Sequence, residues 1–162
     1  MNLLWAPWRI DYILSEKEKG CIFCNKPKED NDFENLILFR GIYSFVIMNR
    51  YPYNSGHLMV VPYRHISQLE NLDDKEMLEV NKILRFSISI LKKIMNPDGF
   101  NIGINLGKAA GAGIDEHLHY HIVPRWVGDT NFMPVFSDTR VVPQTLQDTY
   151  MNLKESFEAI KL

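Results

Sequence analysis

The strongest constraint on the fold is a change of hydrophobic period along the chain. Residues 34–40, 42–49 and 57–62 are short runs rich in Ile, Val, Leu, Phe and Tyr with turn residues between them, and this pattern predicts a series of strands. Residues 73–95 then carry apolar side chains at a period near 3.6, which predicts an amphipathic helix. Strands gathered in runs, rather than alternating with helices, indicate an α+β fold with an antiparallel sheet.

The ends of the helix and the remaining elements follow from local signals. Asp73 is placed as an N-cap with Glu76 three residues later, as in a capping box, and the Asn-Pro-Asp-Gly sequence at 96–99 ends the helix. Residues 100–106 and 117–124 predict two more strands, which brings the sheet to about five, and 143–160 predict a C-terminal helix with Pro143 near its first turn.

The length of the chain favours a single domain. A chain of 162 residues can bury its own core. We expect one domain over residues 1–162, with an N-terminal arm at 1–20, a core at 21–140 and the C-terminal helix within 141–162.

Charge and hydropathy exclude several classes of partner. The net charge is −2 and the basic residues are spread along the chain, so no patch for gripping nucleic acid is expected. No apolar run reaches the ~18 residues of a membrane span, and the N-terminus lacks the features of a secretory signal. We therefore expect a cytoplasmic protein with no membrane partner.

The only two cysteines, Cys21 and Cys24, lie three residues apart. In a reducing compartment this spacing suits a metal or redox pair better than a structural disulfide. The alternative interpretation is a pair of small buried apolar residues.

The histidines are the main functional signal. All five fall in two short stretches, 57–65 and 117–121. Because side chains alternate along a strand, His117, His119 and His121 share one face, and the apolar residues between them occupy the other. Each histidine could simply be a hydrogen-bonded polar residue, but neighbouring imidazoles disfavour one another's charge. At least one should stay neutral near pH 7, as a nucleophile, base or metal ligand.

A glycine-rich loop precedes these histidines. Gly107, Gly111 and Gly113 allow the backbone to approach a ligand closely and to turn N–H groups toward an anion. The loop has neither the P-loop nor the dinucleotide-binding spacing. Phosphate beside imidazole indicates phosphoryl or nucleotidyl transfer.

The run His117-Leu118-His119-Tyr120-His121-Ile122-Val123 resembles the signature of the histidine triad (HIT) family, in which histidines alternate with apolar residues. Residues 5–9, 56–62, 111–121 and 124–132 are similar to the bacterial branch associated with diadenosine tetraphosphate phosphorylase. The resemblance implies a HIT-like antiparallel sheet with the long helix packed on it, and a homodimer.

The resemblance also implies residue roles. His119 would attack the α-phosphorus and form a nucleotidyl-histidine intermediate, and His121 would contact the phosphate and the leaving oxygen. His57 would hydrogen-bond the other ring nitrogen of the nucleophile and fix its tautomer. The substrate-binding residues would be Asn49 at the ribose, Asn105 at the phosphates, Gly111 and Gly113 through backbone N–H groups, and His121. Trp126 could stack on a base, although such an aromatic is more often core or interface.

Structural zinc is the expected cofactor, and no organic cofactor is expected. Zinc takes four Cys or His ligands, of which Cys21 and Cys24 supply two and His65 is the natural third. The resemblance to zinc-bearing bacterial relatives implies His117 as the fourth.

The leading functional hypothesis is phosphorolysis of diadenosine tetraphosphate to ADP and ATP, with nucleotide and inorganic phosphate as partners. The alternative is hydrolysis of dinucleoside polyphosphates or nucleoside phosphoramidates by the same residues. A third hypothesis, from a different class, is a non-catalytic nucleotide- or zinc-binding regulator.

Overall fold

The computed structural model describes residues 20–129 and 144–160, and its centre is a five-stranded sheet in the order β1-β2-β3-β5-β4. Every pair of neighbouring strands is antiparallel. The strands are β1 (Ile37–Arg40), β2 (Ser44–Met48), β3 (Leu58–Pro62), β4 (Gly99–Ile104) and β5 (Tyr120–Arg125). The predicted α+β class and antiparallel sheet are confirmed.

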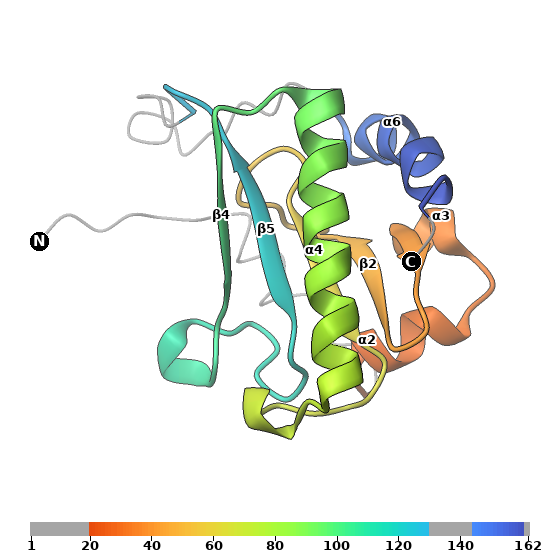
Figure 1. Ribbon diagram of the computed structural model, residues 1–162, viewed down its shortest axis with the longest axis vertical. Coiled ribbons are helices and arrows are strands. Elements are labelled where there is room, and N and C mark those ends of the chain that lie inside the picture. Colours follow the sequence, from red (N-terminus) through yellow and green to blue (C-terminus); the bar gives the residue numbers. More distant parts are fainter. Residues whose placement is uncertain (1–19, 130–143, 161–162) are drawn as a thin grey trace, which may run out of the picture.

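Two longer helices cover one face of the sheet (Figure 1). Helix α4 (Asp74–Met95) packs on β2, β3 and β5, and α6 (Leu146–Glu158) packs on β1 and α4. The shorter elements are α2 (Ile22–Asn25), α3 (Asp32–Asn35) and three 3₁₀ turns, η1 (Lys26–Lys28), η2 (Leu69–Asn71) and η3 (Lys108–Ala110). No helix in the described ranges is long and apolar enough to cross a membrane.

The ends of α4 follow the sequence signals. The Asp73 carboxylate accepts hydrogen bonds from the N–H groups of Lys75 and Glu76, and the Glu76 side chain accepts one from the N–H of Asp73, which completes the predicted capping box. Asn96 ends the helix in the left-handed conformation with φ of 45°.

The first predicted strand begins three residues later than expected. Residues 34 and 35 belong to α3 because the Asn31 side chain caps that turn, accepting a hydrogen bond from the N–H of Glu34. Leu36 then reverses the chain with φ of 60°, so β1 begins at Ile37. Similarly, α6 begins at Leu146, with Thr145 as its N-cap, rather than at 143. Pro143 and the arm at 1–19 lie outside the described residues.

The last strand also begins late, at Tyr120 instead of 117. The β3–β5 register would place Pro62 opposite Leu118. Instead, the carbonyl of Pro62 lies 2.8 Å from Nε2 of His117, and the N–H of Leu118 donates to the carbonyl of Ile66 at 2.6 Å. A histidine side chain thus replaces a ladder hydrogen bond, and residues 117–119 leave the regular strand.

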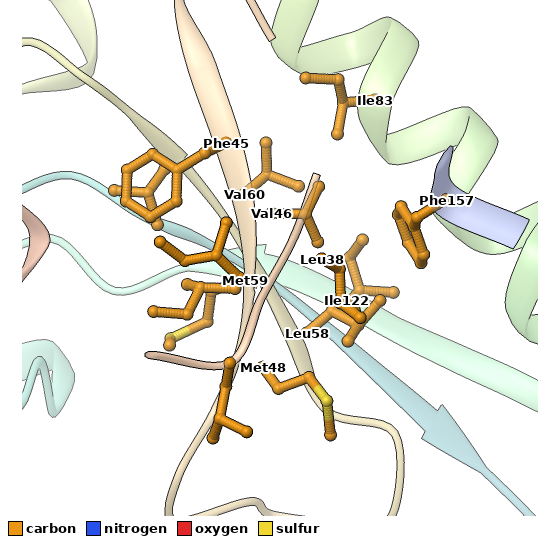
Figure 2. Close-up of a cluster of buried hydrophobic side chains, with 14 of the residues drawn as sticks. Leu38, Phe45, Val46, Met48, Leu58, Met59, Val60, Ile83, Ile122 and Phe157 are labelled. Carbon is orange, nitrogen blue, oxygen red and sulfur yellow. The ribbon is translucent and has the colours of Figure 1, made fainter. Parts of the chain in front are cut away.

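The core lies on both faces of the central strands. All residues of β2 and β3 are buried. Figure 2 shows Ile83 and Phe157 of the helices on one side of the sheet and Phe45 on the other. Phe23, from α2, is 1% exposed and belongs to the same core. Burial on both faces explains why these strands are continuous apolar runs without alternation.

A buried carboxylate joins the sheet to α4. Oε1 of Glu79 accepts hydrogen bonds from the N–H groups of Tyr43 and Ser44 at 2.7 and 2.8 Å and from the Ser44 hydroxyl at 3.0 Å, and Oε2 accepts from Ile42 N–H at 3.0 Å. Glu79 therefore fixes the turn between β1 and β2 to the helix.

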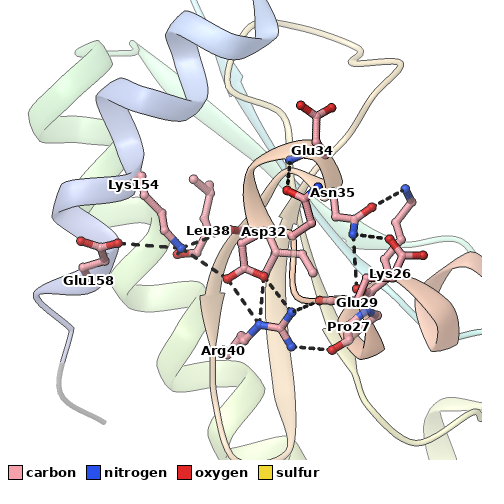
Figure 3. Close-up of polar contacts among 12 residues, drawn as sticks. Lys26, Pro27, Glu29, Asp32, Glu34, Asn35, Leu38, Arg40, Lys154 and Glu158 are labelled. Atoms are coloured by element: carbon pink, nitrogen blue, oxygen red, sulfur yellow. Dashed lines mark hydrogen bonds and ion pairs between the residues drawn. The ribbon is translucent and has the colours of Figure 1, made fainter.

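An arginine network holds the segment that follows the cysteine pair (Figure 3). The Arg40 guanidinium donates to the Asp32 carboxylate at 2.7 Å and to the carbonyl of Pro27 at 2.6 Å, and Lys154 of α6 lies 3.6 Å from Asp32. The Asn35 side chain donates to Glu29 at 2.7 Å. These contacts fasten residues 26–35 to β1 and α6.

We predict that Glu79→Ala lowers the free energy of unfolding in urea by about 3 kcal/mol, because it leaves buried backbone N–H groups without an acceptor. The matched control is Glu155→Ala, which removes an exposed carboxylate from α6 and should change stability by less than about 0.5 kcal/mol. Equal effects of the two substitutions would contradict this account of the turn.

Candidate active site and metal centre

Four histidines meet where β3 and β5 lie side by side. His57 directly precedes β3, and His121 in β5 pairs with Met59 of β3. Tyr120 and Ile122 pack into the core, and His121 therefore points from the opposite face, as the predicted alternation requires. The side chains of His57, His117, His119 and His121 are all buried. The predicted grouping of the catalytic histidines is thus present in the structure.

The backbone fixes the orientation of His119. Its Nδ1 lies 2.8 Å from the carbonyl oxygen of His117. A carbonyl can only accept, so Nδ1 carries the proton and Nε2 presents its lone pair. The expectation that His57 fixes this tautomer is wrong, because the acceptor is the main chain two residues earlier. The lone pair of His119 Nε2 is therefore available for chemistry.

His57 instead fixes the orientation and tautomer of His121. Nδ1 of His57 accepts from Tyr53 N–H at 3.0 Å and lies 3.4 Å from the Asn49 side-chain amide, which places the His57 proton on Nε2. That Nε2 lies 2.9 Å from Nδ1 of His121. The proton of neutral His121 is then on its own Nε2, which is buried and has no hydrogen-bond partner among the described residues. This N–H group is available to a bound ligand.

Burial favours the neutral form of His119 and His121. Burial lowers the pKa of His119, and the hydrogen bond to the His117 carbonyl opposes part of that shift. Burial, and second the neighbouring His119, lower the pKa of His121 to about 4. The rings of His119 and His121 are 4.8 Å apart, centre to centre. The neutral state was expected from repulsion between imidazoles, but desolvation is the larger cause.

Two asparagines lie at the edges of this cluster. Asn49 reaches His57 through its amide, and its Oδ1 accepts from Tyr51 N–H at 2.9 Å. Asn105 directly follows β4, whose last residue, Ile104, pairs with Tyr120 at the start of β5. The substrate contacts expected of both residues stay predictions.

The glycine loop differs in part from the expectation. Gly111 has φ of +84°, a left-handed conformation that favours glycine, and it ends η3. Its N–H donates to the carbonyl of Lys108 at 3.0 Å, so the expected phosphate contact from this group is already engaged within the loop. Gly113 is exposed in the same loop, six residues before His119.

Trp126 lies away from the histidines. It follows the far end of β5, five residues and about 16 Å of strand beyond His121. There it lines a hollow of about 660 Å³ together with Asn54, Met95 and Asp129. The structure does not bring Trp126 to the histidine cluster of its own chain.

The other predicted cluster is assembled beside the triad. The donor atoms of Cys21, Cys24, His65 and His117 all lie within 4.8 Å of one another. Sγ of Cys21 is 3.2 Å from Nδ1 of His117, and Sγ of Cys24 is 3.3 Å from Nδ1 of His65 and 3.6 Å from Nδ1 of His117. Both cysteines are free thiols.

This cluster fits a tetrahedral zinc ion. Bond lengths of about 2.3 Å to sulfur and about 2.1 Å to nitrogen place such ligands about 3.6 Å apart, close to the observed separations. His117 donates from Nε2 to the Pro62 carbonyl, so its Nδ1 lone pair faces the thiols. A carbonyl on the second ring nitrogen is the usual support of a metal-binding histidine.

Two contacts were missed from the sequence. The ring of Tyr53 is 4.7 Å from that of His57, and its N–H sets the tautomer of that histidine. The ring of Phe23 lies 5.0 Å from that of His119. The position of Phe23 between the two cysteines was the available signal for its role.

The comparisons with known proteins agree with this site. A family model described as the HIT domain matches residues 32–127, and the chain belongs to that family. It is 42% identical over 158 residues to a protein named AP-4-A phosphorylase of Mycobacterium tuberculosis, covering 92% of this chain and 80% of the relative. A HIT-like protein of Methanocaldococcus jannaschii is 33% identical over 67% of this chain and 81% of its own. The expected resemblance to an enzyme of the phosphorylase branch is confirmed.

Solved structures confirm the fold. A structure described as a hypothetical histidine triad nucleotide-binding protein of Sulfolobus tokodaii matches with a TM-score of 0.68 and 26% identity, covering 85% of this chain and 92% of its own. A structure described as a zinc-bound histidine triad family protein of Mycobacterium smegmatis matches with a TM-score of 0.67 and 21% identity, covering 86% of this chain and 94% of its own.

We predict that the depressed pKa of His121 makes stability fall in mild acid. Unfolded histidine takes up its proton near pH 6.5 and folded His121 near pH 4, so between these values the unfolded state binds more protons. Between pH 7 and pH 5, the free energy of unfolding in urea should fall by about 2 kcal/mol more in the wild type than in His121→Gln. Parallel pH profiles of the two proteins would show that His121 is not desolvated.

Proposed function

We propose that the protein is a nucleotidyl transferase acting on dinucleoside polyphosphates, and that its reaction is phosphorolysis of diadenosine tetraphosphate to ADP and ATP. The observation that carries the proposal is the buried His119, whose Nδ1 is bound to a carbonyl so that Nε2 is the free nitrogen. Beside it, the Nε2–H of His121 is buried and has no partner within the described ranges.

In the first half-reaction, Nε2 of His119 attacks the α-phosphorus of one adenosine. A P–N bond forms, and the P–O bond to the remaining nucleotide breaks, which releases ATP. A polyphosphate leaving group is a weak base and departs as an anion, so His121 needs to donate only a hydrogen bond to its oxygens. His57, through His121 Nδ1, keeps that N–H directed at the substrate.

In the second half-reaction, inorganic phosphate attacks the same phosphorus. The P–N bond breaks, His119 recovers its lone pair, and ADP leaves. The choice of phosphate over water is supported by the 42% identity to a protein named as a phosphorylase. Asn105, which directly follows β4, would contact the phosphates. Asn49, whose side-chain amide lies 3.4 Å from His57, would meet the ribose.

A structural zinc ion in the cluster of Cys21, Cys24, His65 and His117 belongs to the same proposal. The four ligands would leave no open coordination position, so the metal would hold the fold locally and take no part in bond making. The match to a protein described as zinc-bound, and the free thiols suited to a reducing cytoplasm, support this assignment.

The two edges of the sheet support a homodimer. At the β1 edge, the Tyr150 hydroxyl donates to the carbonyl of Ile37 at 3.0 Å and the Lys154 ammonium donates to that of Leu38 at 3.2 Å, so α6 blocks pairing there. At the β4 edge, residues 101–103 are exposed. An open edge strand is a template for pairing with a second copy.

The first test is product analysis with diadenosine tetraphosphate, with and without inorganic phosphate. We predict ADP plus ATP only when phosphate is present, and loss of turnover by at least about a thousandfold in His119→Ala because the nucleophile is removed. AMP plus ATP without phosphate dependence would instead identify a hydrolase. Turnover retained in His119→Ala would contradict the covalent mechanism, and binding without any turnover would indicate a regulator.

We predict that Ile102→Glu converts a dimer to a monomer, measured by light scattering, because paired β4 edges would bring two carboxylates together. Ile102 is 47% exposed. The control is Met151→Glu, which places a carboxylate on the exposed face of α6 and should leave the dimer intact. A monomeric wild-type protein would rule out this assembly.

A further inference from the structure

We propose that the Cys/His cluster, when it holds its metal, is a positioning device for the nucleophile, acting on His119 through His117 and Phe23. The proposal rests on the zinc site and on the role of His119 described above. Loss of the metal should release the ring of His119 rather than unfold the protein.

The first link is His117, which belongs to both sites. Its ring donates to Pro62 and directs Nδ1 at the thiols of Cys21 and Cys24. Its carbonyl oxygen is the acceptor that fixes His119. Residues 117–119 lie outside the regular strand, so the β ladder does not hold this carbonyl, although the Leu118 N–H of the same peptide donates to the carbonyl of Ile66. A ligand bond to the His117 ring would add a second anchor to the acceptor on which the nucleophile depends.

The second link is Phe23, which lies between the two cysteine ligands in the sequence. Its ring is 5.0 Å from that of His119 and 5.5 Å from that of His117, and it is almost completely buried. A short helix of four residues carries it. Binding of Cys21 and Cys24 to one ion would hold the Phe23 ring in contact with the ring of His119. The hydrogen-bond acceptor and this packing surface of His119 thus both depend on metal ligands.

The remaining attachments of this segment do not involve the cluster. The Arg40 network fastens residues 26–32 to β1, and Phe23 belongs to the core (Figure 3). These contacts should preserve the global fold when a ligand is lost. We therefore expect a local effect at His119 that can be separated from unfolding.

His65 is the ligand that allows a clean test. Its ring contacts Cys24 and His117, and its side chain is exposed, so its replacement leaves the packing of Phe23 on His119 intact. His65→Ala removes one ligand. His65→Cys keeps four donors and is the matched control, since a set of three cysteines and one histidine also binds zinc.

The experiment compares His65→Ala, His65→Cys and wild-type protein, with the wild type measured zinc-loaded, stripped by a chelator and reloaded with zinc. Zinc content is measured in each sample. The ¹⁵N and ¹H shifts of the His119 ring, recorded without substrate at one alkaline pH, report which nitrogen carries the proton. Urea unfolding reports stability, and single-turnover formation of the nucleotidyl-histidine reports the rate.

We expect zinc-loaded wild type and His65→Cys to show one tautomer with the proton on Nδ1. Stripped wild type and zinc-free His65→Ala should show a mixture of tautomers and a single-turnover rate about tenfold lower, with KM changed by less than about twofold. Reloading with zinc should restore the wild type. These shifts do not depend on the reaction, so they test the positioning even if the proposed substrate is wrong.

A His119 tautomer that is unchanged in the zinc-free samples would overturn the proposal, whether or not their stability had fallen. A tautomer that changed while the single-turnover rate stayed at the wild-type value would overturn it as well. A global loss of folded signals on stripping would also contradict it, because the metal would then support the whole fold.

Discussion

The hydrogen bond from Nδ1 of His119 to the carbonyl of His117 is the contact on which the proposed chemistry depends. It decides which nitrogen of a neutral imidazole faces the substrate. The carbonyl is free to accept because residues 117–119 depart from the β3–β5 ladder, with the His117 side chain taking the place of a backbone donor at Pro62. A local irregularity in the sheet therefore orients the proposed nucleophile.

Burying several imidazoles together has an energetic cost that the surrounding hydrogen bonds offset. A chain of hydrogen bonds runs from Tyr53 N–H to Nδ1 of His57, and from Nε2–H of His57 to Nδ1 of His121. It ends at the Nε2–H of His121, which has no partner among the described residues. A buried polar group without a partner normally destabilises a protein by about 1–3 kcal/mol. Its presence next to the nucleophile is best explained by a ligand oxygen that completes the network.

Much of the fold could be predicted from local patterns. The period of residues 73–95 and the pair Asp73 and Glu76 defined α4 closely, and the predicted alternation placed His121 on the face opposite Tyr120 and Ile122. The predicted strand boundaries were less accurate where side-chain hydrogen bonds replace those of the backbone. The Asn31 cap and the left-handed Leu36 delay β1, and the contact between His117 and Pro62, 55 residues apart, delays β5.

The candidate site also has features that could be predicted from the sequence and features that could not. Which histidines and cysteines lie together could be predicted, because their spacing in the sequence groups them in two clusters. Which nitrogen bonds to which partner could not, since it depends on distances between segments far apart in sequence. Thus His57 was assigned to His119 but orders His121, and the N–H of Gly111 is engaged within its own turn. Phe23 and Tyr53 were missed because an aromatic residue gives no sequence signal of what it packs against.

The most direct measurement of the central claim is to identify the covalent intermediate. The protein would be mixed with diadenosine tetraphosphate without inorganic phosphate, quenched within one turnover, digested under alkaline conditions and mapped by mass spectrometry. The account predicts one AMP group attached to the peptide containing residues 117–121, with fragment ions placing it on His119. Turnover with no adduct, or an adduct on His121 or His57, would contradict it.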